Sequence, residues 1–417
     1  MVEYRQEIIK ITYIIMPKII TDKNKIKELL TRGVVDVIVK KSLEKKLMSG
    51  KQLRIKHGVD PTGPKIHLGR ASTLRKLAKF QELGHKVVLI IGDFTALIGD
   101  ASDKDEERTM LTRAQVKENM KGYLKQMGNI FNIEKAEIHY NSEWLSKLNY
   151  YDICRQANAF SAAQILDRDN FSKRFKAGER ISLREMFYPL MQGYDSVAIK
   201  SDIEIGGSDQ LFNVLAGREL QRLYKQEPQD IITFKLMDGI DGRKMSTSWG
   251  NVICVVEDPK DIYGKIMSMR DEIIAQYFEL ATDIFLSEIK KYEQEMKANK
   301  INPRDLKMKL AREIVRIYHG DKKAKQAEEH FIKTVQKKEA PDEVRSKKLE
   351  VRSMNIINLL MEVKLVGSKG EARRLIAQNG IKVDGKIVED ANREIKISKK
   401  EMLLQRGKRQ FVKVIGN

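Results

Sequence analysis

Apolar residues recur at different spacings along the chain, and the spacing separates helical from extended segments. Steps of three and four residues predict helices over 21–53 and 68–83, and Gly84 ends the second of them. The near-continuous apolar run over 86–95 is typical of a strand that is covered on both faces. With a short strand that begins at Leu53, these segments form a strand–helix–strand unit. Such units build parallel sheets, so the pattern predicts an α/β fold.

Further along the chain the same patterns predict more elements of both kinds. Helical spacing dominates over 112–192, strands are expected over 201–205 and 231–236, and a helix is expected over 210–224. Residues 259–338 predict one helix after another. We therefore expect a Rossmann-like, doubly wound parallel sheet that is followed by a helical domain.

The end of the chain has the pattern of a small separate module. Ser368 and Glu371 have the spacing of a helix-capping box, and Asp384-Gly385 predicts a tight turn between two strands. A charged stretch without periodicity precedes the module and predicts a linker. The expected order is an N-terminal extension with helices (1–52), a Rossmann-like domain with a helical insertion (53–250), a helical domain (251–338), a linker (339–350) and a small α+β domain (351–417).

Composition excludes several classes of protein. A chain of 417 residues with 41% hydrophobic and 33% charged residues is too long for one core and too apolar to be disordered. Its two cysteines cannot form a disulfide framework or a four-ligand zinc site, so we expect no bound metal and a reducing, cytoplasmic location. The apolar stretch over 8–20 is too short to span a bilayer, which needs about 20 residues. Met16 is a possible alternative start, which would make residues 1–15 an extension without function.

Charge points to a polyanionic partner. The chain carries 78 Lys and Arg against 58 Asp and Glu, a formal charge of +20. The segment 351–417 alone holds 15 basic and 7 acidic residues, a net charge of +8. Charge concentrated on a compact module favours RNA binding over a merely solvated surface.

Two short segments have the chemistry of a phosphate site. His67 and Gly69 stand at the start of a predicted helix, whose unpaired N–H groups attract anions, and Thr62 adds a hydroxyl before it. Lys244 lies in a small, hydroxyl-rich loop over 242–248 and could bring an ammonium group to a leaving phosphate. Taken singly, each segment could equally be an ordinary exposed turn.

Together the two segments resemble a known family. His67-Leu68-Gly69-Arg70 resembles the HIGH signature, and residues 244–248 resemble the KMSKS signature, of class I aminoacyl-tRNA synthetases. From Leu53 to the C-terminus the chain is similar to bacterial tyrosyl-tRNA synthetases, and residues 371–376 resemble part of their S4 RNA-binding module. The resemblance implies a cytoplasmic enzyme that activates tyrosine with ATP and transfers it to tRNA(Tyr). It also implies a helical domain that reads tRNA, a homodimer through the insertion around 112–180, and no membrane partner.

The amino-acid pocket is the most specific part of the resemblance. Tyr188, Gln192 and Asp195 are spaced to share one face of a helix. In the family, the matching Tyr and Gln hold the α-amino group, and the matching Asp accepts the phenolic hydroxyl. A site built to hydrogen-bond a hydroxyl rejects the analogue that lacks it, and tyrosyl-tRNA synthetases are themselves the standard example. The implied tyrosine-binding residues are Thr95, Asp100, Tyr188, Gln192, Asp195 and Gln210.

The resemblance implies the remaining site residues as well. Those for ATP are Asp60, His67, Gly69, Arg70, Gly206, Gly207, Asp209 and Lys244, with Mg²⁺ accompanying ATP without a protein cage. Those for catalysis are Lys244, His67, Thr62, Lys104 and Arg108. Those for tRNA are Lys369, Arg373, Arg374 and Lys382.

Three positions depart from the family pattern. Arg70 replaces the last His of the first signature, and Lys56 stands where many relatives have a substrate-contacting Tyr. Thr247 replaces the second Lys of the other signature, so activation is expected to be ~10² slower unless Arg243 compensates. Two alternative functions stay open: a catalytically silent RNA-binding paralogue, and a related enzyme such as a tryptophanyl-tRNA synthetase or a nucleotidyltransferase of the same fold. Asp195 argues against tryptophan as substrate, and the basic tail argues against a small-molecule transferase.

Overall fold

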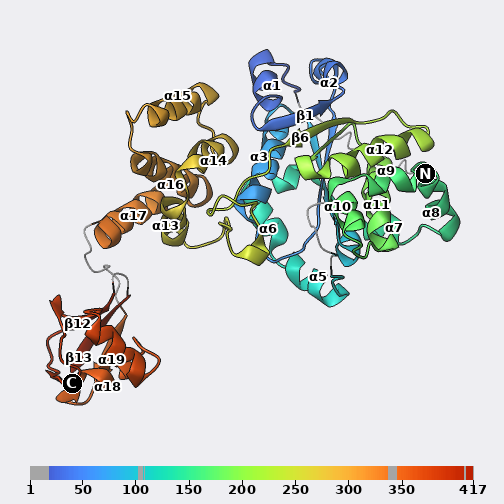
Figure 1. Cartoon of the computed structure of the whole chain (residues 1–417). Coiled ribbons are helices and arrows are strands. Elements are labelled where there is room, and N and C mark those ends of the chain that lie inside the picture. The colour runs from blue at the N-terminus through green and yellow to red at the C-terminus, as the bar shows by residue number, and fades with distance from the viewer. Residues whose placement is uncertain (1–17, 102–106, 108, 337–344, 408–409, 417) are drawn as a thin grey trace, which may run out of the picture. The chain divides into compact units, whose positions relative to one another are not determined.

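A six-stranded sheet organises the N-terminal part of the computed structural model, which describes residues 18–101, 107, 109–336, 345–407 and 410–416 (Figure 1). The strand order is β1-β6-β5-β2-β3-β4, and β2 to β6 run parallel while β1 is antiparallel to β6. This confirms the α/β, Rossmann-like fold. The strands are β1 (Val34–Ile38), β2 (Arg54–Val59), β3 (Lys86–Ile91), β4 (Glu137–Tyr140), β5 (Ile203–Gly207) and β6 (Asp230–Phe234).

Helices connect and cover these strands. The pair α11 and α12 packs side by side and brings its buried residues against the sheet (Figure 1). The helices of this part are α1 (Lys23–Leu29), α2 (Lys40–Leu47), α3 (Leu68–Glu82), α4 (Thr95–Ile98), α5 (Arg113–Met120), α6 (Tyr123–Gly128), α7 (Ser142–Leu145), α8 (Tyr150–Ala157), α9 (Ala162–Leu166), α10 (Asp169–Lys176), α11 (Leu183–Ile199) and α12 (Leu211–Leu223).

Two strands lie where the apolar pattern predicts helix. The expected helical region over 21–53 contains β1, because the first helix ends at Leu29, Gly33 turns the chain with a positive φ of 61°, and the β-branched residues after it pair with β6. In the region over 112–192, β4 extends the sheet beside β3. Both strands are short, and periodicity alone cannot separate a short apolar strand from a turn of helix.

Helices dominate the chain after the sheet, in agreement with the pattern over 259–338. They are α13 (Pro259–Ser268), α14 (Ile274–Ala281), α15 (Leu286–Lys297), α16 (Pro303–His319) and α17 (Asp321–Phe331). The chain divides into two compact units, one formed by residues 1–257 and 268–310, the other by residues 258–267 and 311–417.

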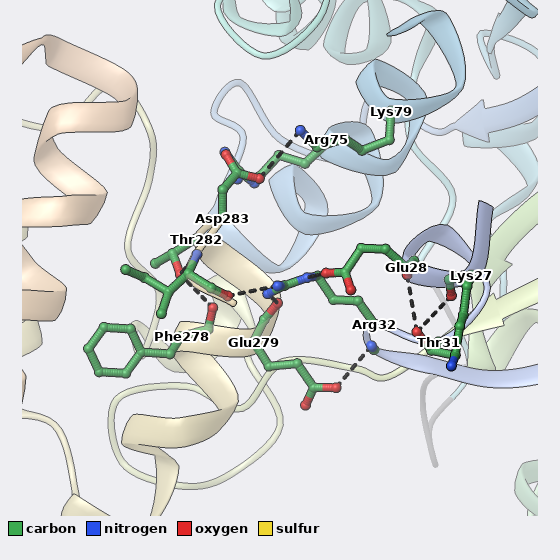
Figure 2. A network of polar contacts seen from close by, with 12 residues as sticks. Lys27, Glu28, Thr31, Arg32, Arg75, Lys79, Phe278, Glu279, Thr282 and Asp283 are labelled. Atoms are coloured by element: carbon green, nitrogen blue, oxygen red, sulfur yellow. Dashed lines mark hydrogen bonds and ion pairs between the residues drawn. The ribbon is translucent and has the colours of Figure 1, made fainter. Parts of the chain in front are cut away.

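A polar network fastens α14 to the N-terminal segment and to α3 (Figure 2). Arg32 donates to the carbonyl oxygen of Glu279 at 3.2 Å, and the Glu279 carboxylate accepts from the backbone N–H of Gly33. In the turn after α14, Asp283 pairs with Arg75 at 2.8 Å and with Lys79 at 3.5 Å. Helix α3, which begins at the HIGH-like turn, is therefore held in its second half by Asp283.

The C-terminal module is a five-stranded sheet with strand order β10-β9-β12-β13-β7, covered by two helices. Its core gathers Leu359, Leu360, Ile381 and Leu404, all fully buried. The elements are β7 (Ser346–Leu349), β8 (Ser353–Asn355), α18 (Ile356–Glu362), α19 (Lys369–Ala377), β9 (Ile381–Val383), β10 (Lys386–Ile387), β11 (Glu394–Lys396), β12 (Met402–Arg406) and β13 (Gln410–Gly416). No helix among the described residues is long and apolar enough to cross a membrane.

Two expectations for this module need correction and one is confirmed. The expected linker over 339–350 contains β7, which pairs in parallel with β13 and so belongs to the module. The capping box is only half formed: the Ser368 hydroxyl accepts from the N–H of Glu371, but the Glu371 carboxylate binds the N–H of Gly367. The turn at Asp384-Gly385, with both φ angles positive, joins β9 and β10 as predicted.

Candidate active site

One cavity of about 520 Å³ lies at the carboxyl ends of the central parallel strands. It brings together nearly all the residues that the sequence singles out for small-molecule binding and catalysis. Those that line it are Asp60, Thr62, His67, Gly69, Arg70, Thr95, Asp100, Tyr188, Gln192, Asp195, Gly206, Gly207, Asp209, Gln210 and Lys244. Lys104 and Arg108 lie outside the described residues.

The HIGH-like turn forms the start of α3. The His67 side chain caps this helix, because its Nδ1 accepts from the N–H of Arg70 at 3.4 Å. The ring proton is therefore on Nε2. Burial lowers the pKa of His67 to about 3, so the imidazole is neutral and its Nε2–H is a donor that carries no charge. Arg70 donates to the Thr62 hydroxyl at 2.6 Å and to the Tyr123 hydroxyl at 2.5 Å.

The KMSKS-like loop meets the same cavity. The Lys244 ammonium lies 3.2 Å from the Asp209 carboxylate. A backbone contact connects the segment just after this loop to the first turn of α3, since the N–H of Leu68 donates to the carbonyl of Ile253 at 2.8 Å. The buried Asn251 side chain closes the loop by binding the carbonyl of Lys244 and the N–H of Ser246. The two signature segments, far apart in the sequence, thus face one space.

Arg243 does not take part in the cavity. Its guanidinium group pairs with Asp241 at 2.6 Å and stacks over the exposed Trp249 ring at 5.0 Å. It is not among the residues that line the cavity. The idea that Arg243 replaces the charge missing at Thr247 therefore finds no support in this geometry.

A carboxylate and two hydroxyls form one wall. Asp60 accepts from the Tyr188 hydroxyl at 2.9 Å and from the Thr95 hydroxyl at 2.7 Å. Burial raises the pKa of Asp60 to about 6, although these two hydrogen bonds act in the opposite direction. Gly92 is necessary here, because a Cβ at that position would lie 1.9 Å from the Asp60 carboxylate.

Asp195 lies at the deep end of the cavity, 3% exposed. The helix α11 that carries it begins at a full capping box formed by Ser182 and Glu185. The Asp195 carboxylate accepts from Trp144 Nε1 at 2.8 Å and from Asn141 Nδ2 at 3.4 Å. Burial raises the pKa of Asp195 to about 7. Tyr188, Gln192 and Asp195 share one helix, as the spacing predicts.

Asp100 completes the polar lining. It accepts from Gln210 Nε2 at 2.8 Å and from Asn213 Nδ2 at 3.4 Å. Gln210 is part of the short 3₁₀ turn that follows Gly206 and Gly207 at the end of β5. These groups come from different crossover connections, and only the sheet brings them together.

Sequence reasoning missed several polar side chains in and around this cavity, among them Asn141, Trp144 and His57. Asn141 and Trp144 follow β4, a strand that the periodicity does not predict, so no signal marked the position as a strand end. His57 lines the cavity from the end of β2, and its Nδ1 donates to the carbonyl of Ile205 at 3.0 Å. Burial lowers the pKa of His57.

Lys56 lies outside the cavity. The position matches a substrate-contacting Tyr in many relatives, but the side chain is completely buried and does not line the cavity. Its ammonium group instead pairs with Glu204 at 2.9 Å. The side chain of a residue on a strand points to one face of the sheet, and Lys56 points beneath α11, away from the opening.

The tRNA-contact residues predicted from the sequence belong to the C-terminal module. Lys369, Arg373 and Arg374 are exposed on α19, and the first two are one turn apart on the same face. Lys382 is half-buried on β9.

The cavity combines two kinds of chemistry. Neutral and cationic donors at the start of α3 and in the Lys244 loop suit a polyanion. The carboxylates of Asp60, Asp100 and Asp195 suit an ammonium group and a hydroxyl. No group of three or more His, Cys, Asp or Glu suited to a metal ion occurs in the part of the chain that the structure describes.

Comparison with known proteins gives matches along nearly the whole chain. The family model for "tRNA synthetases class I (W and Y)" matches residues 48–336, and that for the "Tyrosine--tRNA ligase SYY-like C-terminal domain" matches residues 336–414. The chain is 47% identical to the tyrosine–tRNA ligase of Thermotoga maritima over 390 residues, 93% of this chain and 97% of the relative. It is 44% identical to that of Aquifex aeolicus over 388 residues, with the same two coverages.

Solved structures share the fold. A C-terminally truncated mitochondrial tyrosyl-tRNA synthetase from Aspergillus nidulans gives a TM-score of 0.60 at 23% identity, over 74% of this chain and 93% of that one. The tyrosyl-tRNA synthetase from Archaeoglobus fulgidus, complexed with L-tyrosine, gives 0.59 at 21% identity, over 73% and 99%.

Proposed function

Because the chain belongs to the tyrosine–tRNA ligase family of class I tRNA synthetases, we propose that its cavity activates tyrosine with ATP and then passes the tyrosyl group to the 3′ end of tRNA(Tyr). Membership of this family makes the protein a ligase of tyrosyl-tRNA aminoacylation. The observation that carries the assignment to this cavity is that the HIGH-like turn, the Lys244 loop and the Asp195 carboxylate all line it.

In the first step the tyrosine carboxylate attacks the α-phosphorus of ATP and pyrophosphate leaves. The chain supplies orientation and charge compensation, and no covalent enzyme intermediate is needed. Nε2 of His67 and the hydroxyl of Thr62 are donors for phosphate oxygens, and Lys244 neutralises the charge that grows on the leaving group. Asp209 binds the ribose, and Mg²⁺ enters with ATP, held by its phosphates.

Specificity for tyrosine rests on the deep end of the cavity. Asp195 accepts the phenolic hydroxyl, and the carboxylate of Asp100, with Tyr188 and Gln192, holds the α-amino group. Trp144 and Asn141 orient the Asp195 carboxylate through the hydrogen bonds they donate to it. Phenylalanine would leave this buried acceptor without a donor, which is costly.

A pyrophosphate-exchange assay across the twenty amino acids tests the assignment. Tyrosine alone should support exchange with the purified protein. RNA binding without any exchange would instead identify a catalytically silent paralogue, and exchange with tryptophan would identify the related synthetase.

The C-terminal module binds tRNA through α19. Its net charge of +8 and the exposed Lys369, Arg373 and Arg374 support this role. Lys382 on β9 belongs to the same surface in our proposal. Both cysteines are free thiols, which supports a reducing, cytoplasmic location.

The protein works as a homodimer in this proposal. Large apolar side chains are exposed on the insertion and next to it: Tyr150 and Tyr151 are 82% and 76% exposed, Phe175 is 64% exposed and Leu183 is 70% exposed. Large apolar side chains that are this exposed support an interaction surface on the insertion. The double variant Tyr151→Asp, Phe175→Asp should sediment as a monomer, whereas Phe285→Asp, at an exposed apolar residue outside the insertion, should not change the oligomeric state.

A further inference from the structure

A fully buried ion pair lies beneath the tyrosine end of the cavity. Lys56 on β2 and Glu204 on β5 are register partners on adjacent parallel strands. Their side chains are 0% and 1% exposed, and Lys56 Nζ lies 2.9 Å from Glu204 Oε1. Burying two charges is costly unless both are paired and hydrogen-bonded, so the arrangement needs a compensating function or a complete set of partners.

The partners of this pair come from one turn of α11. Lys56 Nζ donates to the carbonyl oxygen of Gln192 and to the hydroxyl oxygen of Ser196, both at 2.7 Å. Glu204 accepts from Gln192 Nε2 at 3.1 Å and from the Ser196 hydroxyl at 3.0 Å. The lysine and the glutamate therefore each hold the same two residues, and these two residues bracket Asp195 in the helix.

Residues beside β6 and on α12 also pack closely against the pair. Gln229, directly before β6, donates to the same Glu204 oxygen that accepts from the Ser196 hydroxyl. On α12, a Cβ added to Gly217 would lie 2.7 Å from the Ser196 hydroxyl and 3.2 Å from the Glu204 carboxylate. The pair is thus a rigid support between the sheet and the helix that carries the specificity residue.

We propose that the Lys56–Glu204 pair is a positioning element for tyrosine selection: it fixes the Gln192–Ser196 turn of α11 and so aims the Asp195 carboxylate at the substrate hydroxyl. This inference rests on the role proposed above for Asp195. At this position many relatives have a substrate-contacting Tyr, whereas Lys56 here acts from below the pocket through α11.

The pair also sets the electrostatic environment of Asp195. The charged and titratable groups that face this carboxylate are Lys56 from β2, Glu204 from β5 and Tyr188 from α11 itself, while the uncharged Trp144 and Asn141 donate hydrogen bonds to it. Burial raises the pKa of Asp195, and the charge of Lys56 acts against that rise. Removing Lys56 therefore raises this pKa further.

The experiment compares Lys56→Met with the double variant Lys56→Met, Glu204→Met in tyrosine-dependent pyrophosphate exchange by the full-length protein. The single variant leaves Glu204 buried without a partner, which endangers folding. The double variant removes both charges and both sets of contacts to α11, and it fills the space of the ion pair with two apolar side chains. The matched control is Lys76→Met, because Lys76 is also a buried lysine but donates to the carbonyl of Arg32, away from α11.

The double variant should lose about ten- to a hundredfold of the tyrosine-over-phenylalanine preference in kcat/KM. Its KM for ATP should change less than about twofold, and Lys76→Met should keep the full preference. The acid limb of kcat/KM for tyrosine should move to higher pH in the double variant and further still in Lys56→Met, because Glu204 alone disfavours ionisation of Asp195. If the ion pair only stabilised the fold, its removal would not shift the acid limb of kcat/KM for tyrosine.

Three results would overturn the inference: an unchanged preference in the double variant, a parallel rise of the KM for ATP, or a fixed acid limb in both variants. The variant Asp195→Asn, assayed in parallel, distinguishes failure of the positioning role of the ion pair from failure of the role proposed for Asp195. If Asp195→Asn loses the preference and the double variant keeps it, only the positioning role fails. If Asp195→Asn keeps the preference, the proposed role of Asp195 fails as well.

Discussion

Replacing Asp195 by Asn should stabilise the protein at the expense of tyrosine activation. The carboxylate is 3% exposed, and burial raises its pKa from 3.8 to about 7. Between these two values the native state holds a proton that the unfolded chain has released, so the stability of the wild-type protein falls as the pH rises through this window. The rise of about three pH units, at ~1.4 kcal/mol per unit, places a cost of up to about 4 kcal/mol on the native state above pH 7.

Asparagine avoids this cost because it carries no charge at any pH. The free energy of unfolding of Asp195→Asn, relative to the wild type, should therefore increase by about 2–3 kcal/mol between pH 5 and pH 8. Urea unfolding at the two pH values measures it, with Trp144 as the fluorescent probe in a Trp249→Phe background, since the chain has only these two tryptophans. Asp167→Asn, at an exposed carboxylate, is the control and should show no such increase.

The same variant should lose about 10- to 150-fold in kcat/KM for tyrosine, the usual contribution of a hydrogen bond to a charged group. The KM for ATP should stay within about twofold. A stability difference that is equal at both pH values would refute the argument that burial holds Asp195 protonated near neutrality. Equal losses for tyrosine and ATP would refute its role in selection.

Three further predictions test other parts of the proposal. Lys244→Gln should slow pyrophosphate exchange by about 10²- to 10³-fold with little change in the KM for tyrosine, whereas Arg243→Gln, whose side chain lies outside the cavity, should stay within about threefold of the wild type. The double variant Arg373→Glu, Arg374→Glu should weaken tRNA charging and leave pyrophosphate exchange unchanged. Its charging should depend less on salt than that of the wild type, because fewer phosphate contacts remain. A parallel loss of pyrophosphate exchange would contradict this prediction. Leu404→Ala, at a fully buried position in the C-terminal core, should destabilise that module by about 2–5 kcal/mol in urea unfolding. Normal tRNA charging at a temperature where the module has melted would be inconsistent with its role in tRNA binding.

Local patterns in the sequence were sufficient for the elements that carry the chemistry. The spacing of Tyr188, Gln192 and Asp195 predicted one helix face, and a single amphipathic helix holds all three. The start of the helix at Leu68 and the turn at Asp384-Gly385 also followed from local chemistry, because helix ends and tight turns depend mainly on neighbouring residues.

Local patterns failed where the partner lies far along the chain. Strand β1 was interpreted as helix and β4 was missed, because a short strand is defined by the strand beside it and not by its own few side chains. The polar groups at the end of β4 were lost with it, so the sequence did not indicate that Trp144 and Asn141 hold Asp195.

The sequence by itself determined which donors, carboxylates and hydroxyls the chain carries, and which of them share a helix or a turn. Only the tertiary structure decided which of these groups face the cavity and which are buried elsewhere. Lys56 is the clearest case, since its sequence position showed only the loss of a Tyr that contacts substrate in many relatives, whereas the sheet turns its ammonium group under α11 and against Glu204. The physical reason is that a lysine can be buried only where a counter-charge and hydrogen-bond acceptors meet it, and those groups come from a strand and a helix more than a hundred residues away.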